Sequence, residues 1–181
     1  GSDFSYITGL TKFGIEKIPP LVGRGVLVNM AKYFDIISME GGQGITRENI
    51  QEAAKDQNIN FKKGDIILFH TGWTDAKLKT SPEEWGSTIP GITNDAAVYI
   101  ASLQPMAVGA DTWGLGAVPP IAGDKVYYDH ITLIKENGIY ILETMNTGKL
   151  ANDNVSEFMF VLGQPKIKGA VQMIINPVAL W

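Results

Sequence analysis

The stretch HITLIKENGIYILE, residues 130 to 143, begins with one of the two histidines of this chain and ends with a glutamate. Imidazole nitrogen and carboxylate oxygen are standard zinc or manganese ligands, so His130 and Glu143 are candidate metal ligands and catalytic groups. The alternative is an exposed histidine at a helix start and a glutamate paired with a lysine. Two ligands do not complete a catalytic zinc site, and the chain has no H-x-x-x-H or H-x-x-E-H pattern.

The local sequence predicts how these two side chains meet. Residues 130–137 have apolar side chains at helical spacing, Gly138 is a typical helix stop, and residues 139–142 read as a short buried strand. If the helix packs antiparallel on this strand, His130 returns to Glu143, and atoms of the two side chains should lie within roughly 3 to 5 Å. We expect this pair to face a cavity.

His70 is the second histidine, in the stretch ILFHTGW. Alternation along the strand places Ile66, Leu68 and His70 on one face, and one interpretation is a histidine hydrogen-bonded at a strand end. The other interpretation places His70, Thr71 and Trp73 on the wall of a substrate pocket, where the indole offers a flat surface to an aromatic ligand.

Asp111 ends the apolar stretch MAVGAD and has a similar ambiguity. It is either a cap or turn carboxylate, or a group that orients a ligand from behind. Trp113 follows in the Gly- and Pro-rich segment 112–123, which predicts a loop leaving the carboxyl end of a strand. We expect Trp73, Asp111 or Trp113 to line the cavity beside His130. The GLG at 114–116 is a poor dinucleotide signal because Pro119 and Pro120 follow it.

Composition narrows the class of protein. The chain has 181 residues, is 45% hydrophobic and carries a formal charge of −4, with no basic cluster that would follow a phosphate backbone. Nucleic acid is therefore not an expected partner. There is no apolar run long enough to span a membrane and no signal sequence, and there is no cysteine. These features predict a cytoplasmic protein. A small-molecule substrate is expected from the pocket interpretation of His70, Thr71 and Trp73.

Strand-like and helix-like stretches alternate along the chain, which predicts an α/β domain. We expect strands at 24–31, 64–73 and 106–111, helices at 46–57 and 90–103, and two or more strands after residue 156. The length favours a single domain over residues 1–181.

Six blocks of the sequence, in order, resemble the family of cyclases and metal-dependent hydrolases that includes kynurenine formamidases and isatin hydrolases. The resemblance extends from about Gly9 to the C-terminus and is greatest with the isatin hydrolases. The blocks are GLTKFGIEKIPPLVGRGVLVNMA, GDIILFHTGW, PGITNDAAVYIA, AVGADTWGLGAVPP, HITLIKENGIYILETMN and EFMFVLGQPKIKGA.

The resemblance implies a swivelling β/β/α fold with a mixed sheet flanked by helices, a zinc or manganese centre, and hydrolysis of an amide or lactam C–N bond. His130 resembles a histidine that binds metal or relays protons in this family, and Glu143 resembles its late metal-binding glutamate. The loop beginning at Asp111 and Thr112 resembles a pocket wall. The family's main metal motif, of the form H-x-G-T-H-x-D, precedes the first of these blocks, whereas here only GSDFSYIT precedes it.

The sequence therefore predicts an N-terminally truncated domain with an incomplete set of metal ligands. One hypothesis is a metal-dependent hydrolase of aryl formamide or isatin-like substrates. The other is a catalytically inactive relative that acts as a ligand-binding or assembly module. Because loss of an N-terminal segment would expose apolar surface, we also expect a homodimer or a higher homo-oligomer.

Overall fold

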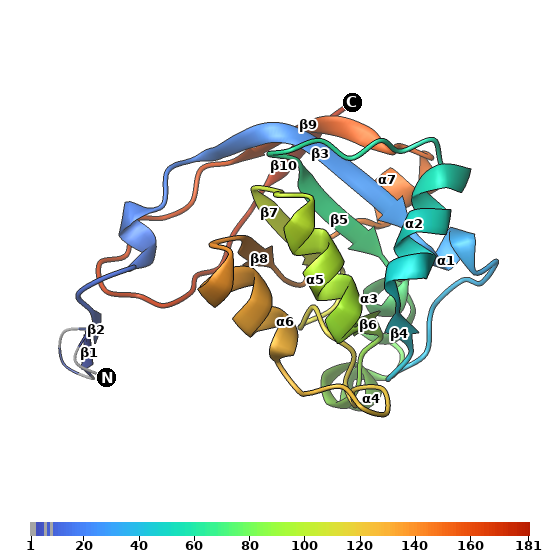
Figure 1. Ribbon diagram of the computed structural model, residues 1–181, viewed down its shortest axis with the longest axis horizontal. Coiled ribbons are helices and arrows are strands. Elements are labelled where there is room, and N and C mark those ends of the chain that lie inside the picture. The colour runs from blue at the N-terminus through green and yellow to red at the C-terminus, as the bar shows by residue number, and fades with distance from the viewer. Residues whose placement is uncertain (1–2, 6, 8) are drawn as a thin grey trace. The chain divides into compact units, whose positions relative to one another are not determined.

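The computed structural model describes residues 3–5, 7 and 9–181, and its central feature is a six-stranded sheet (Figure 1). The strand order is β10-β9-β3-β5-β7-β8. Strands β3, β5, β7 and β8 are parallel to one another, whereas β10 runs antiparallel to β9. The predicted mixed α/β fold with helices beside the sheet is confirmed.

The elements follow in this order along the chain. The strands are β1 Phe4–Ser5, β2 Gly9–Leu10, β3 Leu21–Asn29, β4 Gly44–Ile45, β5 Ile66–His70, β6 Gly91–Ile92, β7 Ala107–Ala110, β8 Tyr140–Leu142, β9 Glu157–Leu162 and β10 Val178–Leu180. The helices are α1 Met30–Tyr33, α2 Arg47–Asp56, α3 Trp73–Lys77, α4 Pro82–Ser87, α5 Asn94–Ser102, α6 Tyr128–His130 and α7 Gly148–Asn152, with a 3₁₀ turn at Ile15–Lys17 and a π-helical segment at Ile131–Glu136.

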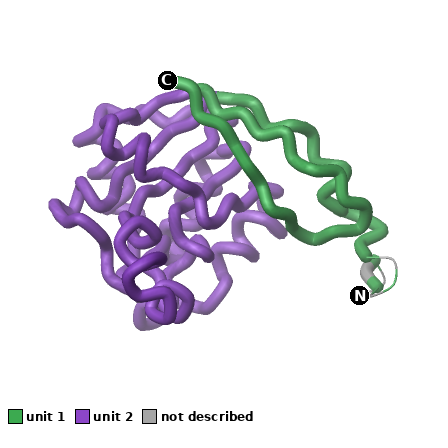
Figure 2. The backbone as a smooth tube through the Cα atoms, turned by 180° about the vertical axis from the view of Figure 1, so that it is seen from behind, with its two compact units in different colours: residues 1–23, 159–181 green, residues 24–158 purple. Residues whose placement is uncertain are grey.

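The described residues divide into two compact units (Figure 2). The smaller unit joins residues 1–23 to 159–181, and its two segments are tied by backbone hydrogen bonds from Leu10 N to Gly169 O and from Ile15 N to Ala170 O. The larger unit comprises residues 24–158 and contains the candidate site. Whether the chain is one domain stays a prediction.

The core of the larger unit lies between the parallel strands and helices α2 and α5. Ile67 and Phe69 of β5 belong to this core, together with Val108 of β7 and Ile100 of α5. His70 follows Phe69 and therefore points to the opposite face of the sheet, as the alternation along β5 predicted.

Several element boundaries differ from the predictions: the strand expected at 64–73 spans only Ile66–His70, and the helix expected at 90–103 spans Asn94–Ser102. The first strand ends at Asn29, because the side chain of Asn29 accepts a hydrogen bond from Lys32 N and caps the short helix α1. The predicted helix from His130 forms, but after α6 it widens into a π-helical segment. No helix among the described residues is long and apolar enough to cross a membrane.

Strands β7 and β8 approach each other closely at Gly109. A Cβ atom built on Gly109 would lie 2.3 Å from the backbone oxygen of Leu142, so any side chain at this position would push the two strands apart. Glu143 follows β8 directly, and its position therefore depends on this contact.

We predict that Gly109→Ala lowers the free energy of unfolding by about 1–3 kcal/mol, because the added methyl group meets backbone rather than a mobile side chain. Urea unfolding measures the change. Gly86→Ala in α4 is the matched control, since its Cβ would have no atom within 4 Å and alanine favours a helix by about 0.5–1 kcal/mol. Equal stability of the two variants would contradict the prediction.

Candidate functional site

His130 and Glu143 lie together in the structure. His130 ends α6, Glu143 follows β8, and the Nε2 atom of His130 is 3.3 Å from Oε1 of Glu143. About one third of each side chain is exposed, 32% for His130 and 34% for Glu143, so the pair is accessible to a ligand. The predicted distance between the two side chains is confirmed. Glu143 is not among the residues that line the small cavity beside His130, so the expectation that the pair faces a cavity holds for His130 alone. The catalytic and metal-binding roles of the pair stay predictions.

Asp129 is a third member of this group, and the sequence analysis missed it. Its Oδ2 atom lies 3.1 Å from Nδ1 of His130, so the imidazole ring lies between two carboxylates. The hydrogen bond with Asp129, followed by that with Glu143, raises the pKa of His130 from 6.5 to about 10, although burial acts in the opposite direction. The only sequence signal was an aspartate next to a histidine.

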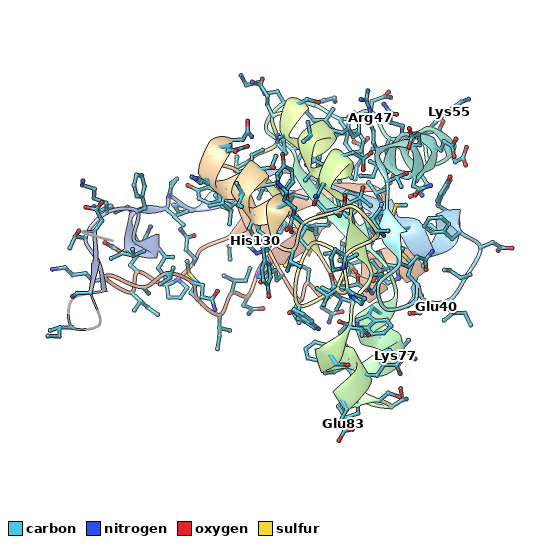
Figure 3. All side chains as sticks on the ribbon, turned by 60° about the horizontal axis from the view of Figure 1, so that its bottom comes forward. Glu40, Arg47, Lys55, Lys77, Glu83 and His130 are labelled. Carbon is cyan, nitrogen blue, oxygen red and sulfur yellow. The ribbon has the colours of Figure 1, made fainter. Side chains whose placement is uncertain are left out.

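A small cavity adjoins His130, formed largely by the loop that leaves β7 and by the start of α6. Its walls include Trp113, Gly116, Tyr127, Asp129 and His130. Figure 3 labels His130 at the end of α6. The prediction that Trp113 lines the cavity beside His130 is confirmed, and the tyrosine adds a second aromatic side chain.

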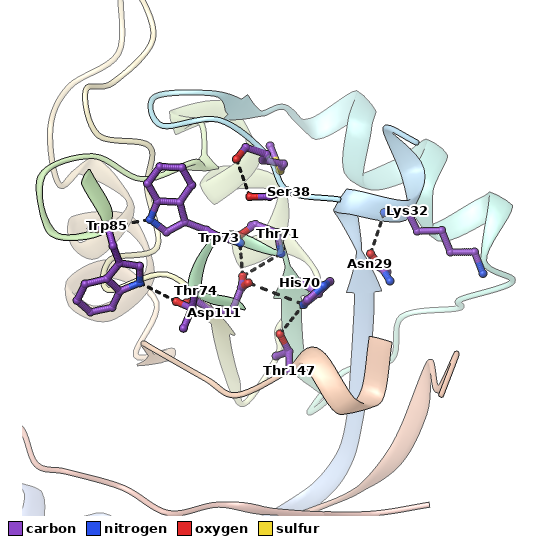
Figure 4. Close-up of polar contacts among 11 residues, drawn as sticks. Asn29, Lys32, Ser38, His70, Thr71, Trp73, Thr74, Trp85, Asp111 and Thr147 are labelled. Carbon is purple, nitrogen blue, oxygen red and sulfur yellow. Dashed lines mark hydrogen bonds and ion pairs between the residues drawn. The ribbon is translucent and has the colours of Figure 1, made fainter. Parts of the chain in front are cut away.

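Asp111 and Trp73 do not belong to the residues that line this cavity. Trp73 has no exposed surface, and its indole Nε1 donates to the backbone oxygen of Trp85 at 3.4 Å (Figure 4). The prediction that Trp73 offers its ring to a substrate is therefore wrong for this structure. The indole packs inside because Gly72 adopts a left-handed conformation and turns the chain into α3.

Asp111 and Thr71 are buried too, and they connect the ends of β5 and β7. Asp111 Oδ1 accepts hydrogen bonds from the Thr71 amide at 2.8 Å and from the Thr71 hydroxyl at 2.7 Å. Burial raises the pKa of Asp111. The nearby His70 and the hydrogen bonds from Thr71 lower this pKa, but by less than burial raises it. These contacts favour the interpretation of Asp111 as a cap or turn carboxylate, and they engage the buried Thr71 hydroxyl in a hydrogen bond.

His70 lies at this second polar cluster and not at His130. Its Nδ1 atom is 2.8 Å from the Thr147 hydroxyl and 3.8 Å from Oδ2 of Asp111 (Figure 4). The ring borders a different, open hollow, whose walls also include Asp75 and Asn146. The structure thus divides the predicted site residues between two places, with Trp113, His130 and Glu143 in one and His70, Thr71 and Asp111 in the other.

The donor set at His130 suits a divalent ion only in part. An imidazole nitrogen and a carboxylate oxygen 3.3 Å apart can serve as two ligands of one zinc or manganese ion. Asp129 contacts the other ring nitrogen and so does not complete that shell. Within residues 3–5, 7 and 9–181, no group of three histidine, cysteine, aspartate or glutamate side chains is arranged to hold a metal ion.

The six-stranded mixed sheet with helices beside it makes the chain a mixed α/β protein. The profile of the family described as "Putative cyclase" matches residues 4–117, which is more than half of the chain. The chain belongs to this cyclase family. No curated protein matches the sequence significantly.

Several solved structures have a similar fold. A structure described as a novel cyclase is similar over 99% of this chain and 60% of its own length, with 28% identity and a TM-score of 0.87. Isatin hydrolase A from Ralstonia solanacearum is similar over 92% of this chain and 63% of its own, with 18% identity and a TM-score of 0.72. A potential metal-dependent hydrolase with cyclase activity is similar over 91% and 69%, with 20% identity and a TM-score of 0.66. The chain spans about 60% of the length of the first of these proteins.

We predict that the stability of the protein falls as the pH rises from about 6.5 to about 10, because the folded state keeps a proton on His130 that the unfolded state has released. The stabilisation by protonated His130 is complete below the pKa of this imidazole in the unfolded chain, 6.5. It is lost as the pH rises through the pKa of His130 in the folded protein, about 10. Urea unfolding between pH 6 and pH 10 should show a weaker decrease in His130→Gln than in the wild type. Identical pH dependence in the two proteins would contradict the prediction.

Proposed function

We propose that the chain supplies the histidine and the glutamate of a metal-dependent hydrolase centre that cleaves an amide or lactam C–N bond. The observation that carries this proposal is the 3.3 Å distance between Nε2 of His130 and Oε1 of Glu143. Membership of the cyclase family and similarity to structures described as a metal-dependent hydrolase and as isatin hydrolases support it. A zinc or manganese ion would supply polarisation of the carbonyl group and activation of water.

The side chains at the site have separate tasks in this proposal. Trp113 and Tyr127 line the cavity, whose volume of about 20 Å³ holds about one water molecule, so an aryl formamide or an isatin-like ring would bind outside it, against these aromatic side chains. Glu143 provides a carboxylate that binds the ion or accepts a proton from water. His130 binds the ion or passes a proton to the leaving nitrogen. Water adds its oxygen to the carbonyl carbon, the C–N bond breaks, and the nitrogen leaves with the proton.

Calorimetric titration with Zn²⁺ and Mn²⁺ tests the metal site. Because two ligands hold an ion weakly, we expect weak binding in the wild type and its loss in His130→Ala and in Glu143→Ala. Lys149→Ala is a surface control, since Lys149 is 71% exposed and lies on α7. Tight stoichiometric binding that survives replacement of both His130 and Glu143 would reject this assignment.

A catalytically inactive relative is the second candidate function. It is favoured by the donor set in the described part of the chain, in which no group of three histidine, aspartate or glutamate side chains is placed to hold an ion. Such a protein would keep the aromatic cavity and act as a ligand-binding or assembly module. Assays with N-formylkynurenine, isatin and simple aryl formamides in the presence of added metal separate the two functions. Turnover that a chelator abolishes supports the hydrolase, and complete inertness supports the binding module.

A further inference from the structure

Asp129 is buried in a part of the chain whose apolar side chains are exposed. It is only 4% exposed, whereas Val126 and Tyr127 just before it are 55% and 59% exposed. An aspartate is rarely buried this deeply unless it is paired. Its hydrogen-bonding partner is Nδ1 of His130, the next residue.

This contact between adjacent residues depends on the surrounding backbone. Neighbouring side chains on a regular helix point in different directions and do not normally face each other. Here α6 starts abruptly after Tyr127, which adopts a left-handed conformation with φ of 57°, and it changes to the π-helical segment directly after His130. The ring of Tyr127 also meets the imidazole edge-on, with centroids 5.6 Å apart.

A glycine makes room for the carboxylate. A Cβ atom built on Gly116 would lie 3.2 Å from both Cγ and Oδ1 of Asp129, so the carboxyl group rests directly on the backbone of the loop that lines the cavity. A larger residue at position 116 would require Asp129 to move. The loop at Gly116 and the start of α6 thus leave space for the carboxyl group of Asp129 and enclose it.

We propose that Asp129 is a positioning residue, which holds Nδ1 of His130 as a hydrogen-bond donor so that Nε2 is the nitrogen presented to Glu143 and to the reaction. This inference rests on the proposed function, because it assigns Asp129 a task in that same centre. A ring turned by 180° about its Cβ–Cγ bond would place a carbon atom against the carboxylate and lose the hydrogen bond. The carboxylate therefore selects one ring orientation, as carboxylates behind metal-binding histidines generally do.

The orientation can be measured without metal or substrate. The chain has only two histidines, so ¹⁵N-labelled protein gives two sets of ring signals, and His130→Gln identifies which set belongs to His130. We expect the Nδ1 proton of His130 to be protected from solvent exchange in the wild type. In Asp129→Ala the protected signal should be lost, whereas Asp129→Asn, which keeps an acceptor oxygen, should retain it in part. The ring signals of His70 should not change.

A second measurement connects the orientation with metal binding. Zinc affinity should fall about 10- to 100-fold in Asp129→Ala and by less in Asp129→Asn, as for other residues that orient metal-binding histidines. Glu136→Gln is the matched control, because Glu136 lies on the surface of the following π-helical segment and its replacement also removes one negative charge. This control should bind zinc as the wild type does.

The two measurements separate the inference from the proposed function. An unchanged, protected Nδ1 proton in Asp129→Ala would overturn the role of Asp129. Zinc binding that is insensitive to His130→Ala and Glu143→Ala would instead reject the metal centre while the orienting contact stands. Amide spectra show whether each variant is folded. If Asp129→Ala does not fold, Asp129→Asn is the deciding variant. An exchange rate of the His130 Nδ1 proton in Asp129→Asn equal to that in Glu136→Gln would overturn the inference.

Discussion

The parallel pairing of β7 with β8 is the contact on which the candidate site depends. Glu143 occupies its position because β8 ends just before it, and β8 lies close to β7 because Gly109 has no side chain to hold the strands apart. His130 ends α6, and the π-helical segment that continues from it packs on β8. A histidine and a glutamate from two different elements of one local stretch thereby come within 3.3 Å.

The second polar cluster has a structural role at the same edge of the sheet. Asp111 accepts two hydrogen bonds from Thr71 and so connects the end of β7 to the end of β5. Its other carboxylate oxygen is buried and has no hydrogen-bond partner among the described residues, although Nδ1 of His70 is 3.8 Å away. Leaving a buried carboxylate oxygen unsatisfied is costly, so this cluster depends on the nearby imidazole for compensation.

The parts of the site that the sequence predicted are those governed by local patterns. Helical spacing from His130, the stop at Gly138 and the apolar strand before Glu143 were sufficient to predict that the pair meets. Alternation along β5 correctly placed His70 on the face opposite Phe69.

The parts that the sequence did not predict depend on long-range packing. Trp73 follows a glycine at a strand end and looked like a pocket residue, but its indole is enclosed beside the backbone of Trp85. Asp129 gave no periodic signal, because its carboxyl group is buried against the loop backbone at Gly116, a contact that hydrophobic spacing does not encode. The π-helical form of residues 131–136 has no signature in hydrophobic spacing either.

That π-helical segment fixes the length of the connection between the two candidate catalytic residues. A π-helical turn contains one more residue than the matching α-helical turn, and each residue of an α-helix turns the chain by about 100°. Deleting one residue between His130 and Gly138 would let the widened turn close as a regular α-helical turn with the same total rotation, and the imidazole would keep its direction toward Glu143. The widened turn therefore accommodates one extra residue between the histidine and the glutamate without turning the two side chains apart.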